Sequence, residues 1–143
     1  MTFIALTDAV FVAPQIDTKA VAEAAGLGVT LIINNRPEDE SHDQTPGKLI
    51  EAAARAAGMN YVAIPVGHSG FSQPQVDAMV DALRQVDGKI LAYCRSGTRS
   101  TLLWALAQAK TGADPETLSA TAAEAGYDLS PIRPLLDMFK GQA

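Results

Sequence analysis

The stretch KILAYCRSGTRSTLLWALAQAK, residues 89–110, decides how this sequence is interpreted. Its first five residues, Lys89–Tyr93, form a short apolar run that is typical of a buried strand. From about Arg99 to Lys110 the chain is apolar on nearly every side of a helix, which predicts a buried helix. Between these two elements lies the loop CRSGTRS, Cys94–Ser100. We therefore expect a strand that runs through a short loop directly into a helix.

The rest of the chain alternates strand and helix patterns. Such alternation predicts an α/β fold: one domain over residues 1–143, with a mainly parallel sheet of four to five strands and helices on both faces. The expected strands are Ala9–Ala13 with a partner at Phe3–Leu6, then Val29–Asn34, Tyr61–Val66 and Lys89–Tyr93. The expected helices begin at Asp17, Thr45-Pro46, Ser72, Arg99, Asp114-Pro115 and Ser130-Pro131.

Three loops are expected to meet at one edge of this sheet. Parallel α/β sheets place their sites beyond the carboxyl ends of the strands. The loops that leave those ends are Asn34–Glu40, Pro65–Ser72 and Cys94–Ser100. The sequence therefore predicts one site to which all three contribute.

Composition and charge exclude several classes of protein. With 48% hydrophobic and 19% charged residues, the 143-residue chain can build a globular core, which excludes a disordered tail. One cysteine excludes a disulfide framework and a Cys-rich zinc site, and a lone thiol fits a reducing compartment. A net charge of −5 makes nucleic acid an unexpected partner.

The sequence also predicts where the protein works. Its N-terminus lacks the features of a signal peptide, and no apolar run approaches the roughly 18 residues that span a bilayer. We expect a cytoplasmic protein without a membrane partner. The two histidines and scattered acids form no metal pattern, and no nucleotide-binding glycine motif is present, so neither a metal nor a cofactor is expected.

The Cys94–Ser100 loop has the chemistry of an anion site. Backbone N–H groups at a helix N-terminus are unpaired and favour an anion, and Gly97 lets the loop fold tightly around it. Arg95 and Arg99 add two positive charges, and the guanidinium of Arg99 can offer a two-pronged donor. The residues expected to bind the anion are Arg95, Ser96, Gly97, Thr98, Arg99 and Ser100, with the hydroxyls of Thr98 and Ser100 directed to the anion or to the sulfur.

Cys94 is the candidate nucleophile of this site. A thiol at the end of a buried strand, under the positive field of two arginines, is expected to be held as the thiolate. A thiolate at the floor of an anion site faces any bound anionic substrate. The competing interpretation is a core cysteine, which is the commonest fate of a free thiol. The Cys-x-x-Gly-x-Arg pattern between a strand and a helix favours the nucleophile.

Two further residues are candidates on the neighbouring loops. Arg36 either borders the anion site, with Glu40 orienting it, or forms a surface ion pair with Glu40 worth under about 1 kcal/mol. His68 is either a proton donor or a loop residue exposed to solvent.

Four segments carry a resemblance to known proteins. CRSGTR resembles the active-site loop of rhodanese-type sulfurtransferases, with Cys first and Arg last. The wider chain resembles a bacterial family of phosphatase-like domains that are found attached to β-lactamase-like hydrolases, also called DUF442. The segments that carry the second resemblance are FVAPQ from Phe11, IINNRPEDE at Ile32–Glu40, AIPVGHSG at Ala63–Gly70 and YCRSGTRSTLLWAL at Tyr93–Leu106. This family implies a protein-tyrosine-phosphatase-like fold.

The two resemblances imply different reactions. Tyrosine and dual-specificity phosphatases place five residues between Cys and Arg, whereas four separate Cys94 from Arg99. They also have a His before the Cys, where this chain has Tyr93, and an Asp on a neighbouring loop that protonates the leaving group. The loop Pro65–Ser72 contains no Asp or Glu, and His68 is its titratable residue. A poor leaving group needs such an acid, whereas sulfite leaving thiosulfate does not.

The favoured prediction is therefore a sulfurtransferase. Cys94 would take sulfane sulfur as a persulfide and pass it to an external thiol, such as glutathione or a protein thiol. A metallo-β-lactamase-like, sulfur-oxidising protein is then an expected partner. The alternative is a phosphatase that uses the same nucleophile through a phosphocysteine. The small anionic substrate is thiosulfate in the first case and a phosphate ester in the second. A non-catalytic domain that binds anions or senses oxidants is the third interpretation.

Overall fold

Five strands form one sheet in the order β1-β2-β5-β3-β4 in the computed structural model, which describes residues 3–84 and 87–143. β1 runs antiparallel to β2, and the other neighbouring pairs are parallel. The predicted α/β fold with a mainly parallel sheet is confirmed. The strands are β1 (Ile4–Ala5), β2 (Val10–Ala13), β3 (Val29–Asn34), β4 (Asn60–Ala63) and β5 (Lys89–Tyr93).

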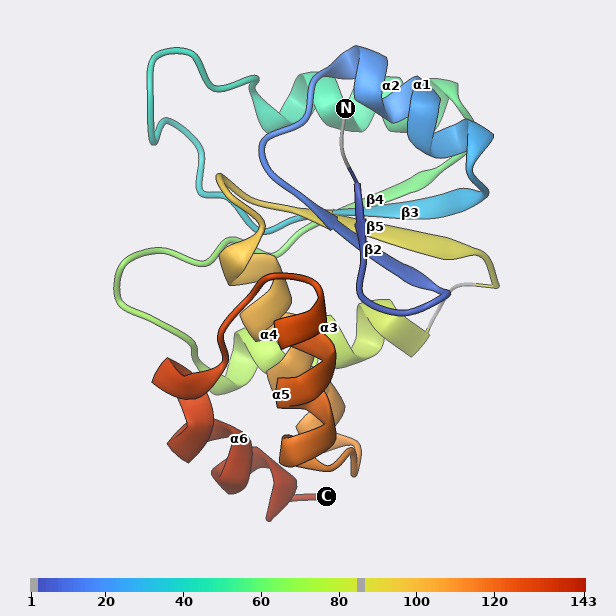
Figure 1. Ribbon diagram of the computed structural model, residues 1–143. Coiled ribbons are helices and arrows are strands. Elements are labelled where there is room, and N and C mark those ends of the chain that lie inside the picture. Colours follow the sequence, from blue (N-terminus) through green and yellow to red (C-terminus); the bar gives the residue numbers. More distant parts are fainter. Residues whose placement is uncertain (1–2, 85–86) are drawn as a thin grey trace.

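Helices cover both faces of this sheet (Figure 1). α1 and α2 lie on one face, and α3 to α6 lie on the other. Because successive side chains of a strand point to opposite faces, β5 sends Ile90 and Ala92 into the larger core cluster and Leu91 and Tyr93 into the smaller one. The helices are α1 (Thr18–Gly26), α2 (Gly47–Ala56), α3 (Gln73–Arg84), α4 (Thr98–Lys110), α5 (Pro115–Glu124) and α6 (Arg133–Lys140).

Local side-chain bonds begin several of these helices where the sequence predicts. The Asp17 carboxylate accepts the Ala20 N–H at 2.8 Å at the start of α1, and Asp114 caps α5 in the same way. The Ser72 N–H donates to the Gln75 side chain at 2.8 Å, which is half of the predicted capping box before α3.

Two predicted helix starts differ in detail. Pro46 precedes α2 as its N-cap instead of being its first residue, and the Glu38 carboxylate accepts the Gly47 N–H at 2.8 Å. Proline has no side-chain acceptor, so the carboxylate of Glu38 on the preceding loop caps this helix in its place. Ser130-Pro131 opens a short 3-10 turn, Ser130–Ile132, and α6 follows it.

β4 is shorter than predicted, because it ends at Ala63 instead of Val66. Beyond its end, the N–H groups of Ile64 and Val66 donate to the carbonyls of Asn34 and Asn35, each at 2.9 Å. The chain therefore stays beside the end of β3 although the regular ladder has stopped. These bonds bring the start of the Pro65–Ser72 loop next to the loop that follows β3.

The parallel strands end at one level. Tyr93 of β5 is opposite Ala13 of β2 and Asn34 of β3, and Asn34 is opposite Ala63 of β4. The loops after β3, β4 and β5 consequently leave the same edge of the sheet, as predicted.

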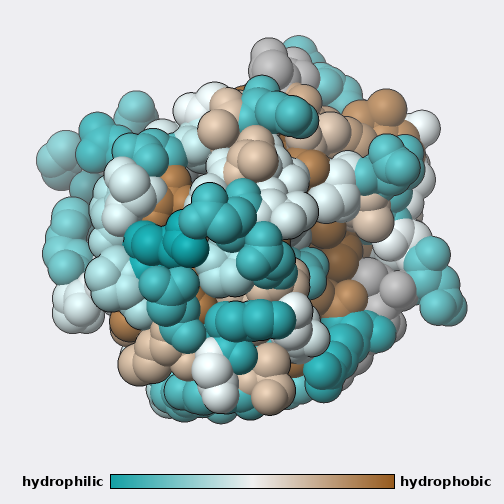
Figure 2. Space-filling view, turned by 60° about the horizontal axis from the view of Figure 1, so that its bottom comes forward, coloured by the Kyte–Doolittle hydropathy of each residue, from teal (hydrophilic) through white to brown (hydrophobic). Residues whose placement is uncertain are grey.

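The outer side of the α3–α6 layer presents mostly hydrophilic or neutral residues, with apolar residues in small patches between them (Figure 2). Within residues 3–84 and 87–143, no helix has the length and hydrophobicity that a bilayer crossing requires.

Candidate active site

Cys94 is fully buried and follows β5 directly. The Gly97 N–H donates a hydrogen bond to its sulfur at 3.1 Å. Gly97 is the N-cap of α4 and has a φ of 91°, in the left-handed region that glycine adopts without strain. This turn directs a backbone N–H at the sulfur and points the first turn of α4 toward the same place. A negative charge on the sulfur is stabilised by both.

The Cys94 loop, residues Cys94–Ser100, is held from outside by its carbonyl groups. The Arg95 carbonyl accepts the Gln15 N–H at 3.3 Å, and the Ser96 carbonyl accepts the Tyr127 hydroxyl at 3.2 Å. The Gly97 carbonyl accepts the Thr101 hydroxyl at 2.8 Å. Since C=O and N–H point in opposite directions across a trans peptide, carbonyls bonded outward leave the N–H groups facing the opposite side.

Arg99 is fixed by a fork of hydrogen bonds. Its two terminal nitrogens donate to the two carboxylate oxygens of Glu40 at 2.8 and 2.9 Å. One of them also donates to the Val66 carbonyl at 2.7 Å. The bonds to Glu40 raise the pKa of Arg99, and the nearby Cys94 sulfur raises it further. The guanidinium is therefore a fixed positive charge close to the Cys94 sulfur.

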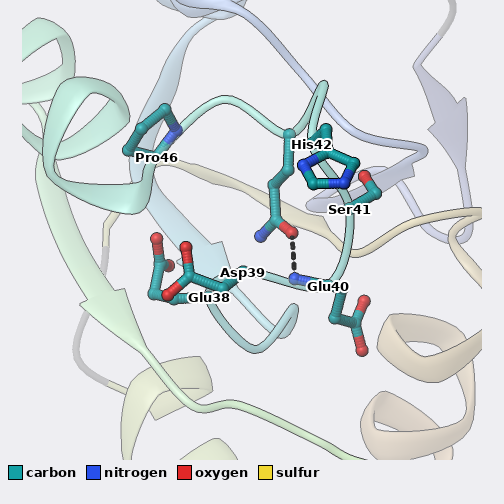
Figure 3. A pocket seen from close by; sticks show the side chains of 7 residues that line it. Glu38, Asp39, Glu40, Ser41, His42 and Pro46 are labelled. Atoms are coloured by element: carbon teal, nitrogen blue, oxygen red, sulfur yellow. Dashed lines mark hydrogen bonds between the residues drawn. The ribbon is translucent and has the colours of Figure 1, made fainter.

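Glu40 is ionised and serves two arginines. The bonds from Arg99, with a smaller effect from Arg36, lower its pKa to about 2 from the ordinary 4.5. The loop that carries it is closed by Gln44, whose side chain accepts the Glu40 N–H at 2.9 Å (Figure 3) and donates to the Pro37 carbonyl at 2.9 Å. Glu40 thus orients Arg99 and cannot supply a proton near neutral pH.

The structure places Arg36 behind Glu40. Its side chain is 4% exposed, and it donates to Glu40 at 2.9 Å, to Gln15 at 2.9 Å and to Ser41 at 3.1 Å. Neither sequence interpretation describes this arrangement. Arg36 is too buried for a surface ion pair, and its donor groups are directed to protein acceptors instead of an anion at the Cys94 loop. It reaches the site through Glu40.

Glu40, His68, Arg95 and Arg99 line a cavity of about 250 Å³. His68 and Arg95 are exposed, whereas Arg99 is partly buried. Residues from the loops after β3, β4 and β5 therefore meet at one cavity, as the sequence predicts. A cavity with two guanidinium groups and one imidazole suits a small anion.

The predicted hydroxyl groups have separate positions. Ser100 is buried and its hydroxyl donates to the Asn35 side chain at 2.8 Å, so the hydroxyl proton is directed to Asn35 instead of the predicted sulfur or anion. The amide of Asn35 in turn donates to the Ile64 carbonyl at 2.9 Å, which ties the loops after β3 and β5 together. Ser96 and Thr98 are exposed and bond to each other at 3.0 Å, on the outer rim of the Cys94 loop.

Two further residues, Tyr127 and Gln15, contact this site although the sequence does not point to them. Both contact the Cys94 loop from segments far away in the chain, and neither belongs to a motif. Gln15 lies within the segment FVAPQ that the resemblance quoted, which was a signal without an assigned role.

The fold and the Cys94 loop together place this protein among the cysteine-based, phosphatase-like proteins. More specifically, the chain belongs to the family described as beta-lactamase hydrolase-like protein, phosphatase-like domain, whose model matches residues 2–111. The resemblance to the DUF442 family of phosphatase-like domains is confirmed.

Named relatives and solved structures agree with this family assignment. The chain is 30% identical over 112 residues to a beta-lactamase hydrolase-like protein of Xylella fastidiosa strain Temecula1, covering 78% of this chain and 26% of that protein. The chain thus spans about a quarter of that relative's length. A candidate phosphatase from Neisseria meningitidis has a TM-score of 0.84 at 29% identity, covering 97% of this chain and 99% of that one. Tk-PTP in its active form has a TM-score of 0.74 at 13% identity, covering 99% and 97%, which shows a shared fold.

Proposed function

We propose that this protein is a cysteine-dependent phosphatase that hydrolyses a small phosphate monoester. The observation that carries the proposal is the pairing of the buried Cys94 sulfur, bonded by the Gly97 N–H, with a guanidinium that Glu40 holds beside it. In such an arrangement the guanidinium and the loop N–H groups can bind phosphate oxygens while the sulfur faces phosphorus as the nucleophile. The family and the likeness to the Neisseria protein support the same chemistry.

The reaction has two steps. The Cys94 thiolate attacks phosphorus, an S–P bond forms, and the P–O bond to the leaving alcohol breaks. The leaving oxygen takes a proton from His68, which lines the cavity, or from water. Water then attacks the phosphocysteine, the S–P bond breaks, and inorganic phosphate leaves with the thiolate restored. Arg99 and the loop N–H groups stabilise the charge on the phosphoryl oxygens in both steps.

A specific observation keeps sulfur transfer as the second candidate. Glu40, a carboxylic acid that lines the cavity, is ionised and occupied by two arginines, so it is no proton donor. In sulfur transfer the thiolate attacks the sulfane sulfur of thiosulfate, the S–S bond breaks and sulfite leaves with both electrons of that bond. An external thiol then takes the sulfur from the Cys94 persulfide. No step needs an acid for a poor leaving group.

One experiment separates the candidates. Purified protein is supplied with an aryl phosphate, and separately with thiosulfate plus cyanide or glutathione. Phosphate release, with a phosphate trapped on Cys94 by rapid acid quench and detected by mass spectrometry, supports the phosphatase. Thiocyanate or glutathione persulfide, with one sulfur added to Cys94, overturns it in favour of sulfur transfer.

The control is Cys94→Ser, which keeps the side-chain size and removes the thiolate. Both reactions should fall to background in this variant, by roughly a thousandfold or more. Full activity in Cys94→Ser would contradict nucleophilic catalysis altogether. Absence of both products in the wild type would favour a non-catalytic domain that binds anions or senses oxidants.

A further inference from the structure

Tyr127 lies against the Cys94 loop although it belongs to the turn after α5. The model of the family ends at residue 111 and does not include it. Its hydroxyl donates to the Ser96 carbonyl at 3.2 Å. A Cβ atom at Gly97 would lie 2.3 Å from the same hydroxyl oxygen, so the ring is seated directly on the bare glycine backbone.

The Tyr127 bond and the bond to the sulfur are made by one peptide unit. The carbonyl of Ser96 and the N–H of Gly97 are the two polar ends of that planar group and point in opposite directions. Tyr127 binds the carbonyl end, and the Cys94 sulfur accepts from the N–H end at 3.1 Å. A donor on the carbonyl fixes the peptide plane and polarises its N–H, because hydrogen bonds in series strengthen one another.

The Tyr127 hydroxyl is suited to this task. Burial, and to a lesser degree the charge of the nearby Cys94 sulfur, raise the pKa of Tyr127 above its ordinary 10.0. The phenol therefore keeps its proton and stays a donor throughout the neutral range.

We propose that Tyr127 is a positioning residue, which holds the Ser96–Gly97 peptide so that its N–H stabilises the Cys94 thiolate. The charged or titratable groups that interact with this sulfur are Arg99 on α4 and Tyr127 after α5. Arg95 and His68 line the adjoining cavity with Glu40. The inference deepens the proposed function, because it concerns the nucleophile on which that function rests.

The test is the pH dependence of thiol alkylation in Tyr127→Phe. This variant keeps the ring on Gly97 and removes the hydroxyl alone. The rate at which iodoacetamide alkylates Cys94 is measured from pH 4 to pH 10 by mass spectrometry. We expect the midpoint of the profile to rise by about 0.5–1 pH unit, because one stabilising hydrogen bond in the chain is lost. At a pH below both midpoints, where the thiolate fraction limits the rate, activity should fall in parallel by roughly three- to tenfold.

Tyr61→Phe is the matched control. Tyr61 of β4 is also a half-buried tyrosine. Its hydroxyl accepts a hydrogen bond from the Asn34 side chain at 3.0 Å. Its alkylation profile should match the wild type. Alkylation needs no phosphate chemistry, so this result is independent of whether the proposed function holds.

A second variant separates positioning from packing. Tyr127→Ala removes the ring as well, and its midpoint should rise at least as far as that of Tyr127→Phe. If Tyr127→Phe keeps the wild-type midpoint, the proposal is overturned, whether or not Tyr127→Ala differs. A thermal unfolding curve for each variant shows that the compared proteins are folded.

Discussion

The loops after β5 and after β4 line the same cavity, yet they are held in different ways. In the Cys94 loop, three successive carbonyls accept bonds: those of Arg95 and Ser96 from the distant residues Gln15 and Tyr127, and that of Gly97 from Thr101 in the first turns of α4. The loop Pro65–Ser72 is bonded at its ends: the Val66 N–H donates to the Asn35 carbonyl, and the Ser72 N–H donates to the Gln75 side chain. Its tip, which carries His68, is exposed.

This difference indicates which part of the chemistry the fold prepares in advance. The groups that we propose to bind an anion and hold a thiolate are fixed by hydrogen bonds within the protein, and electrostatic stabilisation is effective when its donors are fixed in advance. The group that would deliver a proton sits at an exposed tip. Reactions limited by anion binding and nucleophilic attack should therefore depend on many residues. Reactions limited by protonation of the leaving group should depend on His68 alone.

The largest effect is expected for Arg99→Lys. Lysine keeps the positive charge but cannot offer the planar fork that Glu40 accepts, so the charge is no longer fixed beside the sulfur. We expect kcat/KM of the wild-type reaction to fall by about 100-fold or more. Steady-state kinetics measures it, with the aryl phosphate or thiosulfate, whichever of the two the wild type converts.

The matched control for this change is Arg55→Lys. Arg55 also pairs with a glutamate, Glu51, but on the exposed surface of α2. Its kcat/KM should stay within about twofold of the wild type, since exposed pairs contribute little. Equal losses in the two variants would show that the fork on Arg99 has no special part.

Glu40→Gln should produce the next largest loss. Glutamine can accept from one arginine nitrogen, but it removes the charge that both Arg36 and Arg99 contact. We expect kcat/KM to fall by roughly 10- to 100-fold, mainly through a less well oriented Arg99. Glu51→Gln, the corresponding change in the exposed pair, serves as control. A Glu40→Gln enzyme with normal kinetics would show that Arg99 needs no partner to be oriented.

The strongly held loop was also the part that the sequence predicted best. CRSGTRS lies between a short apolar run and a long apolar helix, so its position at a strand end follows from local patterns. The loop chemistry alone predicts that Cys94, Gly97 and Arg99 lie together, and the structure places Gly97 and Arg99 near the Cys94 sulfur. The order of strands and helices followed from the same local patterns.

The residues that hold this loop were harder to predict, because their contacts arise from tertiary packing. Tyr127 meets Ser96 because α5 packs against α4, and no local signal marks that contact. The sequence predicted Arg36 at the correct strand end. The orientation of its side chain depends on Gln15 and Ser41, which accept hydrogen bonds from its guanidinium. Ser100 likewise turns to Asn35 because the loops after β3 and β5 lie side by side.

His68→Asn tests the other loop, and its effect should depend on the leaving group. If His68 donates the proton, loss of the imidazole slows an alkyl or unsubstituted phenyl phosphate by about tenfold or more, and leaves 4-nitrophenyl phosphate within about twofold. The ratio of the two kcat/KM values is the measurement. His42→Asn changes the other histidine, which is also exposed, and should leave this ratio unchanged.

An equal loss on both substrates would contradict a proton-donor role and indicate that His68 helps to bind the anion. An unchanged ratio would assign protonation to water. The Cys94 loop would then take part in the reaction, whereas the loop Pro65–Ser72 would supply no proton.

The smallest effect concerns the pH dependence of stability. In the folded protein the pKa of Glu40 is lowered to about 2 from 4.5, chiefly by Arg99. A carboxyl with a lowered folded-state pKa stabilises the fold fully above pH 4.5, and this contribution is lost as the pH falls toward 2. Between pH 6 and pH 3 the wild type should therefore lose about 1 kcal/mol more than Glu40→Gln in the free energy of unfolding. Urea unfolding of both proteins at each pH measures this, and parallel curves would show that the pair with Arg99 contributes no net stability.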